Sequence, residues 1–152
     1  MNSRVTRILD AAGINYEIRL HSKDVFTVEE AAQERGVRPA QLVKVMVVRL
    51  SGNRLIAVLL PGDRRLDLKK LRLILGEKRL ALATHEEIEQ TTGYPVGAVS
   101  PIGLPAEMPL YMDTKVLEEE SIAISAGRPD AGVVLKSADL QQLLRVELGN
   151  FS

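Results

Sequence analysis

The chain has 152 residues, which fits one domain spanning residues 1–152 and suffices to bury a core without metal or disulfide cross-links. It has no cysteine, which excludes disulfides, thiol nucleophiles and cysteine-ligated metals. Twenty Lys and Arg balance twenty Asp and Glu, so wholesale electrostatic capture of a long nucleic acid is disfavoured. No uncharged run approaches ~18 residues, so we expect no signal peptide, no membrane span and a cytoplasmic location.

Helix and strand signals alternate over the first part of the chain. Ser3 is typical of a helix start and Gly13 of a helix end, and Thr27 forms a capping box with Glu30 at a second start. The elements expected here are a helix over 3–12, a strand over 15–20, a helix over 27–35 and strands over 43–50 and 55–60. The last two are apolar on both faces, so we expect a hairpin at the centre of a sheet.

The second half of the chain is richer in short strands. Asp67 and Thr84 are typical helix caps, whereas the stretch from Tyr94 to Pro109 holds four prolines and no periodicity, which indicates a long, shaped loop. The elements expected here are helices over 67–75, 84–92 and 137–144, and strands over 80–82, 110–112, 121–125 and 132–135. These patterns predict a domain of mixed helix and strand.

Lys44 is the most informative single residue, because it lies on an otherwise apolar predicted strand. It shares one face with Met46, while Val43 and Val45 lie on the other. A lysine in such a strand reaches water at the strand's open end, pairs with a carboxylate, or serves as a functional cation. The pattern alone leaves these explanations open.

The segment from Gly93 to Gly103 has the composition of a loop whose backbone approaches a ligand closely. Gly97 and Gly103 permit close approach, and the prolines restrict the loop's conformations. Amides held in this way can form an oxyanion hole. The alternative is an ordinary irregular crossover.

Other polar residues give weaker signals. Ser125 lies where a predicted strand ends and turns, and it either supplies a binding hydroxyl or only caps the turn. His21 and His85 have no metal-ligand spacing, so we interpret them as surface residues of a loop and of a helix start. The motifs of a catalytic triad and of phosphate-binding glycine loops are absent. A basic cluster over residues 64–79 is a solvated face or a phosphate-binding surface.

Five segments, taken in order, carry a resemblance to a known family. They are TVEEAA at 27–32, LVK at 42–44, LLPGD at 59–63, LDLKKL at 66–71 and the run over 92–103. The chain resembles the YbaK/ProX family, which contains free-standing aminoacyl-tRNA deacylases and the editing insertion domain of bacterial prolyl-tRNA synthetase. The resemblance covers nearly the whole chain and implies an α+β fold with a mixed, mainly antiparallel curved sheet flanked by helices.

The resemblance also implies trans-editing, the hydrolysis of mischarged tRNA such as Ala- or Cys-tRNA for proline. Lys44 would engage the terminal adenosine or its phosphate, and Gly97 begins a GxxxP loop whose backbone amides would hold the aminoacyl carbonyl. Ser125 is the third expected catalytic residue. The other residues expected around the substrate are Ala98, Val99, Ser100 and Pro101 of the loop and Gly127 of the opposite wall.

Tyr16, Phe26 and Met46 are the candidates for the pocket wall that sizes the amino acid, although each also suits the core. A water molecule oriented by the loop and by a ribose hydroxyl would attack the ester, so the implied mechanism requires no metal and no cofactor. Family members commonly have Thr directly after the lysine. Because this chain has Val45 there, we expect its specificity to differ.

The expected partner is the acceptor end of a misacylated tRNA, with prolyl-tRNA synthetase as a second candidate. A non-catalytic module that grips aminoacyl-tRNA or a synthetase is the main alternative function. A hydrolase for another amino acid ester or adenosine-linked ester is the next. The sequence leaves the edited amino acid, the tRNA and the oligomeric state open.

Overall fold

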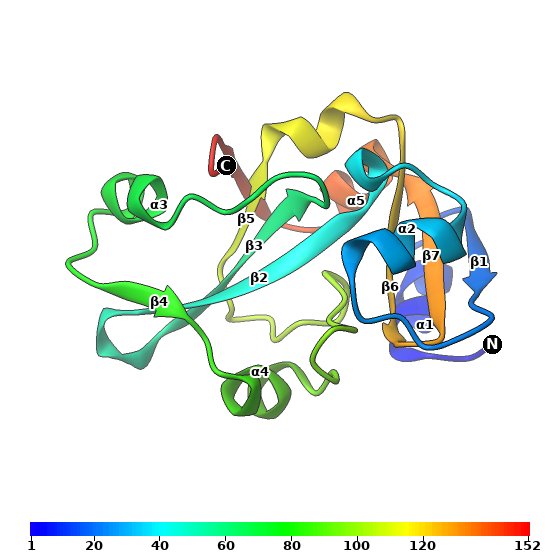
Figure 1. Ribbon diagram of the computed structural model, residues 1–152, viewed down its shortest axis with the longest axis horizontal. Helices are drawn as coiled ribbons and strands as arrows, with labels where there is room; N and C mark the ends of the chain where they lie inside the picture. The colour runs from blue at the N-terminus through cyan, green and yellow to red at the C-terminus, as the bar shows by residue number, and fades with distance from the viewer.

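The computed structural model describes residues 1–152, which form two β-sheets with helices around them (Figure 1). The α-helices are α1 (Arg4–Ala11), α2 (Val28–Arg35), α3 (Leu68–Leu75), α4 (His85–Thr92) and α5 (Ser137–Leu143). Short 3₁₀ helices span Pro39–Gln41, Ser51–Asn53 and Thr114–Glu118. The α+β class is therefore confirmed.

The smaller sheet is antiparallel throughout and has the strand order β1–β7–β6. Its strands are β1 (Tyr16–Leu20), β6 (Ser121–Arg128) and β7 (Ala131–Lys136). A register shift after Ser125 leaves Gly127 out of the ladder at φ +90°, a conformation that favours glycine. The bulge lies where the sequence predicted a turn.

The larger sheet is mixed and has the order β4–β2–β3–β5–β8. Its strands are β2 (Val43–Leu50), β3 (Leu55–Pro61), β4 (Leu80–Leu82), β5 (Leu110–Asp113) and β8 (Val146–Gly149). The β2–β3 hairpin is central, as predicted, and antiparallel, whereas β3–β5 and β5–β8 pair in parallel. A single parallel bridge between Leu42 and Ala123 joins the two sheets. The sequence did not predict this division into two sheets.

Most of the predicted helix caps are formed. The side chains of Ser3, Thr27, Asp67 and Thr84 each accept a hydrogen bond from a backbone N–H in the first turn of α1, α2, α3 and α4, respectively. Ser137 instead lies inside α5, whose cap position is Lys136. Local capping chemistry therefore fixes where four of the five helices begin.

Two apolar clusters hold the sheets together. The main cluster lies between α1, the smaller sheet and one face of the larger sheet, and it includes Leu9, Val43, Leu59 and Ile124. The second covers the opposite face of the β2–β3 hairpin beneath α3 and includes Leu60, Leu71 and Phe151. Because β2 contributes to both, its residues are covered on both faces. Lys44 therefore lies in a largely apolar setting.

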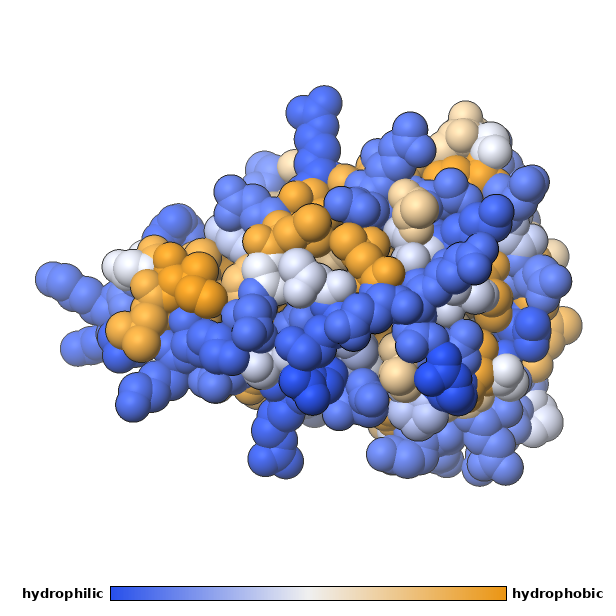
Figure 2. All heavy atoms as spheres, turned by 90° about the horizontal axis from the view of Figure 1, so that it is seen from above, coloured by the Kyte–Doolittle hydropathy of each residue, from blue (hydrophilic) through white to orange (hydrophobic).

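The surface beyond these clusters is mostly polar. Leu73 and Ile74 on α3 are exceptions, with exposed fractions of 64% and 53%. Figure 2 shows an apolar patch at the end of the molecule where α3 lies in Figure 1, among long polar side chains. None of the helices is long and apolar enough to cross a bilayer.

Candidate functional site

A cleft of about 350 Å³ opens beside β2, α2, α4 and the loop after α4. Most of the residues that line it are apolar, and the side chains that line it include no Asp or Glu. The polar side chains of its wall are Thr27, Arg35, Lys44, His85 and Ser125. The structure contains no group of three or more His, Asp or Glu side chains that could hold a metal ion. The cleft is therefore an apolar hollow with a few basic and hydroxyl groups.

Lys44 lines this cleft from the second position of β2, where it pairs with Leu60 of β3. Its Nζ donates a hydrogen bond of 3.4 Å to the carbonyl of Gly62, and no carboxylate lies within ion-pair distance. Burial lowers the pKa of Lys44, although the nearby Asp63 partly opposes the shift. The ammonium is thus half-buried and available to an anionic ligand.

The loop over residues 93–103 contributes two residues with unbonded backbone amides to the wall of the cleft. Gly97 and Val99 both line it, and neither N–H has an acceptor within the chain. Gly97 has φ +87°, which is strained for any residue with a Cβ atom, while the Ala98 amide is already bonded to the carbonyl of Pro95. Unbonded backbone donors of this kind are what an oxyanion hole is built from.

Residues beneath the loop hold its two ends together. The Arg4 guanidinium donates to the carbonyl of Thr92 at 2.9 Å and to that of Gly103 at 2.8 Å, and it lies 4.3 Å from the centre of the Tyr94 ring. The Tyr94 hydroxyl in turn donates to the carbonyl of Ile102. The loop is therefore fixed by side chains that do not themselves reach the cleft.

Ser125 fixes the middle of the same loop from the smaller sheet. Its buried hydroxyl donates to the carbonyl of Ala98 at 2.8 Å and accepts from the amide of Gly127 at 3.0 Å. The carbonyl of Ala98 accepts no hydrogen bond from any other group of the chain. The geometry suits a residue that positions the Gly97 and Val99 amides rather than one that attacks a substrate.

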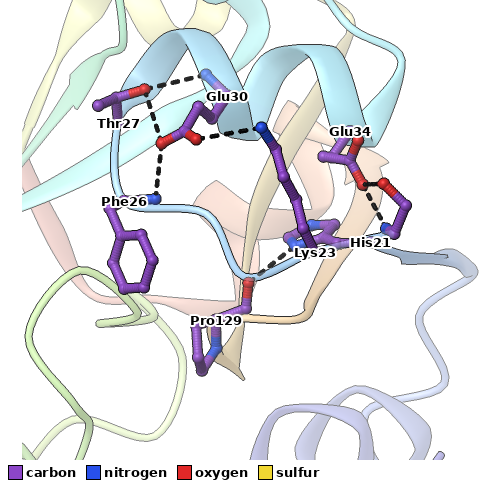
Figure 3. A network of polar contacts seen from close by, with 8 residues as sticks. His21, Lys23, Phe26, Thr27, Glu30, Glu34 and Pro129 are labelled. Atoms are coloured by element: carbon purple, nitrogen blue, oxygen red, sulfur yellow. Dashed lines mark hydrogen bonds and ion pairs between the residues drawn. The ribbon is translucent and has the colours of Figure 1, made fainter.

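Phe26 lies at the edge of the cleft with 74% of its surface exposed. Figure 3 shows its ring pointing away from α2, while Glu30 accepts hydrogen bonds from the Phe26 amide and the Thr27 hydroxyl and pairs with Lys23. These hydrogen bonds and the Lys23 ammonium hold the pKa of Glu30 below its usual value. The segment before α2 is thus fastened to the helix, which fixes the position of an exposed aromatic ring.

The structure divides the predicted site residues other than Tyr16 into two groups. Lys44, Gly97, Ser125, Phe26, Met46 and Val99 line the cleft, and Val45, the departure from the family pattern, lines it too. Ala98, Ser100, Pro101 and Gly127 lie behind it and build the loop and its support. In that second group the Ser100 hydroxyl accepts from the amide of Ile102, and a Cβ at Gly127 would lie 2.7 Å from the Tyr94 ring.

Tyr16 does not line the cleft. On β1 it pairs with Leu135 of β7 and packs against the main core on the side of α1, and its hydroxyl donates to Asp10. The cleft lies on the other face of that sheet, with Ser125. Because side chains on a strand alternate between faces, Tyr16 points away from the site.

Arg35 is the cleft residue that the sequence interpretation missed. It is only 4% exposed and lines the cleft from the last turn of α2. A signal was present, because Arg35 follows Ala31 by four residues and therefore shares the buried face of the helix. His85 was correctly predicted as an exposed helix-start residue, but it also lies at the rim of the cleft.

Part of the basic cluster lies near the other end of β4, whereas Arg65 lies near Lys44. Arg72, Lys78 and Arg79 line a second hollow beside the tip of the β2–β3 hairpin, together with Arg49, which pairs with Glu87 of α4. No acidic residue lines this hollow. Strand β4 leads from it to the cleft, since Leu80 and Ala81 line the hollow and Leu82 lines the cleft.

Comparison with protein-family models finds a match to the aminoacyl-tRNA editing domain over residues 22–143. The chain belongs to this family. The match includes the cleft residues Lys44, Gly97 and Ser125, and it confirms the resemblance seen in the sequence.

Curated relatives of this editing domain include tRNA deacylases and synthetases. The Multifunctional Ser/Thr-tRNA deacylase ProXp-y of Escherichia coli strain K12 is 29% identical over 154 residues, covering 99% of this chain and 92% of the relative. A proline–tRNA ligase of Nitratidesulfovibrio vulgaris strain DP4 is 36% identical over 104 residues, covering 68% of this chain but only 18% of the ligase. The chain is thus similar both to a free-standing deacylase and to one segment of a synthetase.

Solved structures agree on the fold of the editing domain. The crystal structure of the hypothetical protein APE2540 matches with a TM-score of 0.89 and 28% identity, covering 97% of this chain and 98% of that one. The structure of a protein described as a candidate trans-editing enzyme for prolyl-tRNA synthetase matches with a TM-score of 0.87 and 28% identity, covering 98% and 94% of the two chains.

Proposed function

We propose that this editing domain hydrolyses the ester bond between an incorrect amino acid and its tRNA, acting in trans. One observation carries the proposal: a cleft without acidic side chains brings the Lys44 ammonium together with the unbonded amides of Gly97 and Val99. Such a cleft suits the 3′ end of an aminoacyl-tRNA, which offers a phosphate to the cation and an ester carbonyl to the amides.

In this mechanism the chain positions and polarises the ester, and the substrate assists. Lys44 holds the phosphate of the terminal adenosine, and the Gly97 and Val99 amides donate to the ester carbonyl. Water adds to the carbonyl carbon, and the amides stabilise the oxyanion that forms. A neighbouring ribose hydroxyl orients the water. When the carbon–oxygen bond to the ribose breaks, the proton that the water gives up passes to the leaving ribose oxygen, and the amino acid leaves with the water's oxygen in its carboxyl group. Ser125 keeps the amides in place through its bond to Ala98.

The sequence resemblance favours Ala- or Cys-tRNA for proline as the substrate, and the name of the Escherichia coli relative adds Ser and Thr. All four are small. A synthetase pocket separates side chains that differ by one methylene by only ~1–3 kcal/mol, so a second hydrolytic site improves fidelity. Met46 and Phe26 at the cleft wall are the residues proposed to limit the size of the amino acid.

The partner in this proposal is the acceptor end of a misacylated tRNA. The second hollow, with Arg72, Lys78 and Arg79, provides charge for phosphates of the acceptor strand. Because the net charge of the chain is zero, the electrostatic contact with tRNA is confined to this surface. Prolyl-tRNA synthetase is the proposed partner that delivers the substrate. The same surface would serve a module that only holds aminoacyl-tRNA.

The test is release of amino acid from Ala-, Cys-, Ser-, Thr- and Pro-charged proline tRNA by the purified protein. We expect hydrolysis of at least one mischarged tRNA, with Pro-tRNA spared. A Lys44→Met variant should lose that activity, whereas Lys136→Met, which removes an exposed lysine away from the cleft, should retain it. Tight tRNA binding without release of any amino acid would overturn the proposal and favour the binding module.

A further inference from the structure

Arg35 is a buried cation without a counter-ion. It is 4% exposed, and its one side-chain hydrogen bond runs from Nε to Nε2 of His21 at 3.3 Å. No carboxylate lies within 4 Å, and the terminal guanidinium nitrogens have no acceptor in the chain. Neither terminal nitrogen is among the fully buried atoms that lack a partner, so both reach the solvent of the cleft that Arg35 lines. An acceptor from outside the chain can replace water there and pair with the guanidinium.

The histidine contact fixes the direction of the guanidinium. Nδ1 of His21 lies 2.9 Å from the carbonyl of Pro129, to which only an N–H can donate. Nε2 is therefore left without a proton and accepts from Arg35, which uses the inner nitrogen of the guanidinium. The two terminal nitrogens, with four N–H donors, remain for the cleft that Arg35 lines.

Gly132 of β7 makes room for the side chain. A Cβ at Gly132 would lie 2.3 Å from Nε of Arg35 and 2.5 Å from its Cδ, so the arginine stem crosses the strand where a side chain is missing. Gly132 pairs with Ser125, and directly paired residues present their side chains on the same face. Arg35 therefore lies beside Ser125, which anchors the loop carrying the Gly97 and Val99 amides.

Four groups near the ester of an aminoacyl-tRNA could meet this guanidinium: the phosphate, the ester carbonyl, the α-ammonium group and the side chain of the amino acid. The phosphate is assigned to Lys44 and the ester carbonyl to the loop amides in the proposed function. The α-ammonium group is a cation, and it is repelled by Arg35. The remaining group is the side chain of the amino acid. An oxygen on that side chain would supply the acceptor that the buried guanidinium lacks.

We propose that Arg35 makes this deacylase selective for amino acids whose side chain carries a hydroxyl oxygen, with Ser and Thr preferred over the aliphatic residues of matching size. This inference rests on the proposed function and narrows its substrate class. It differs from the size limit set by the apolar wall, because Ser and Ala, or Thr and Val, differ little in volume. A site that hydrogen-bonds a hydroxyl rejects the analogue without it, since the buried donors are then left unpaired.

The experiment compares kcat/KM for the pairs Ser- and Ala-tRNA and Thr- and Val-tRNA, each pair on one tRNA. We expect the wild type to favour the hydroxyl-bearing member of each pair by about tenfold or more. Arg35→Met should lose that preference, because it should slow the release of Ser and Thr more than the release of Ala and Val. Arg38→Met removes an exposed arginine nearby and should leave the preference intact.

A second variant covers the case in which Arg35→Met does not fold. Gly132→Ala keeps the charge but displaces the guanidinium, and it should reduce the same preference. Equal loss on both members of each pair, or an unchanged preference in a folded variant, would overturn the role of Arg35. Absence of turnover by the wild type on every substrate would instead overturn the proposed function itself.

Discussion

The bond between Ser125 and the loop gives the sharpest test of how the amides are positioned. Ser125→Ala removes a donor to the carbonyl of Ala98 and an acceptor for the amide of Gly127. Ala98 is 1% exposed, so its carbonyl has no easy access to water. Leaving this buried carbonyl unpaired costs about 1–3 kcal/mol in the free energy of unfolding, and the half-buried Gly127 amide adds less because water can reach it. For a chain of this size that loss lowers Tm by roughly 2–12 °C.

The loss of Ser125 should also reduce catalysis below the temperature of unfolding. Without the hydroxyl the Gly97 and Val99 amides are less well held, so we expect kcat for deacylation to fall about tenfold or more while KM changes little. The assay is single-turnover release of amino acid, run beside thermal unfolding by circular dichroism. Ser125→Thr retains a hydroxyl and should restore part of the activity.

Ser137→Ala is the matched control. Ser137 is also buried, and its hydroxyl donates to the carbonyl of Glu119 at 2.6 Å, away from the cleft. The Ser137→Ala variant should lower Tm without lowering kcat. Loss of activity in Ser125→Ala with an unchanged Tm would refute the positioning role, because it would show that the hydroxyl acts on the substrate directly.

Three further outcomes follow from charged groups. Because burial lowers the pKa of Lys44, deacylation that needs its ammonium should weaken, through a higher KM, at a pH below the ordinary lysine value of 10.5; a pH profile of kcat/KM checks this. Lys78→Ala combined with Arg79→Ala should slow deacylation of whole tRNA and reduce its salt dependence, yet spare a short aminoacylated CCA oligonucleotide. Burial opposes ionisation of Asp113, but hydrogen bonds from the amides of Lys115 and Phe151 lower its pKa. The stabilisation that the fold gains from this carboxylate is complete above the unfolded pKa of about 3.8, and it is lost as the pH falls from there through the lower, folded pKa. The free energy of unfolding, measured from neutral to acidic pH, should therefore fall more in the wild type than in Asp113→Asn.

Local sequence signals predicted much of the fold, because capping and periodicity act over a few residues. Thr27 and Thr84 each start a helix as expected, and the β2–β3 hairpin forms around residues 51–53. The strand Val146–Gly149 was missed, since it is short and its partner β5 lies more than thirty residues earlier in the chain. The division into two sheets likewise depends on pairing between distant strands.

The site was predictable where a residue conflicts with its surroundings. Lys44 interrupts an apolar strand, and Gly97 lies in a proline-rich loop with no periodicity, so both stood out in the sequence. The sequence left Tyr16 open between the pocket wall and the core, because a period of two shows that side chains alternate but not which face borders the cleft. The structure packs Tyr16 against the main core. Arg35 was missed because a charged residue in an amphipathic helix is usually exposed, although its spacing from Ala31 placed it on the buried face. Tertiary packing against Gly132 makes room for its side chain.

The cleft is assembled from segments that are far apart in the chain, and this affects when it can form. Lys44 comes from the first third of the sequence, Gly97 from the middle and Ser125 from β6, which pairs with the later strand β7. During synthesis the Lys44 wall emerges well before the strand that anchors the Gly97 loop. A partly synthesised chain therefore lacks the support for its amides, and hydrolytic competence arises only once the C-terminal strands have paired.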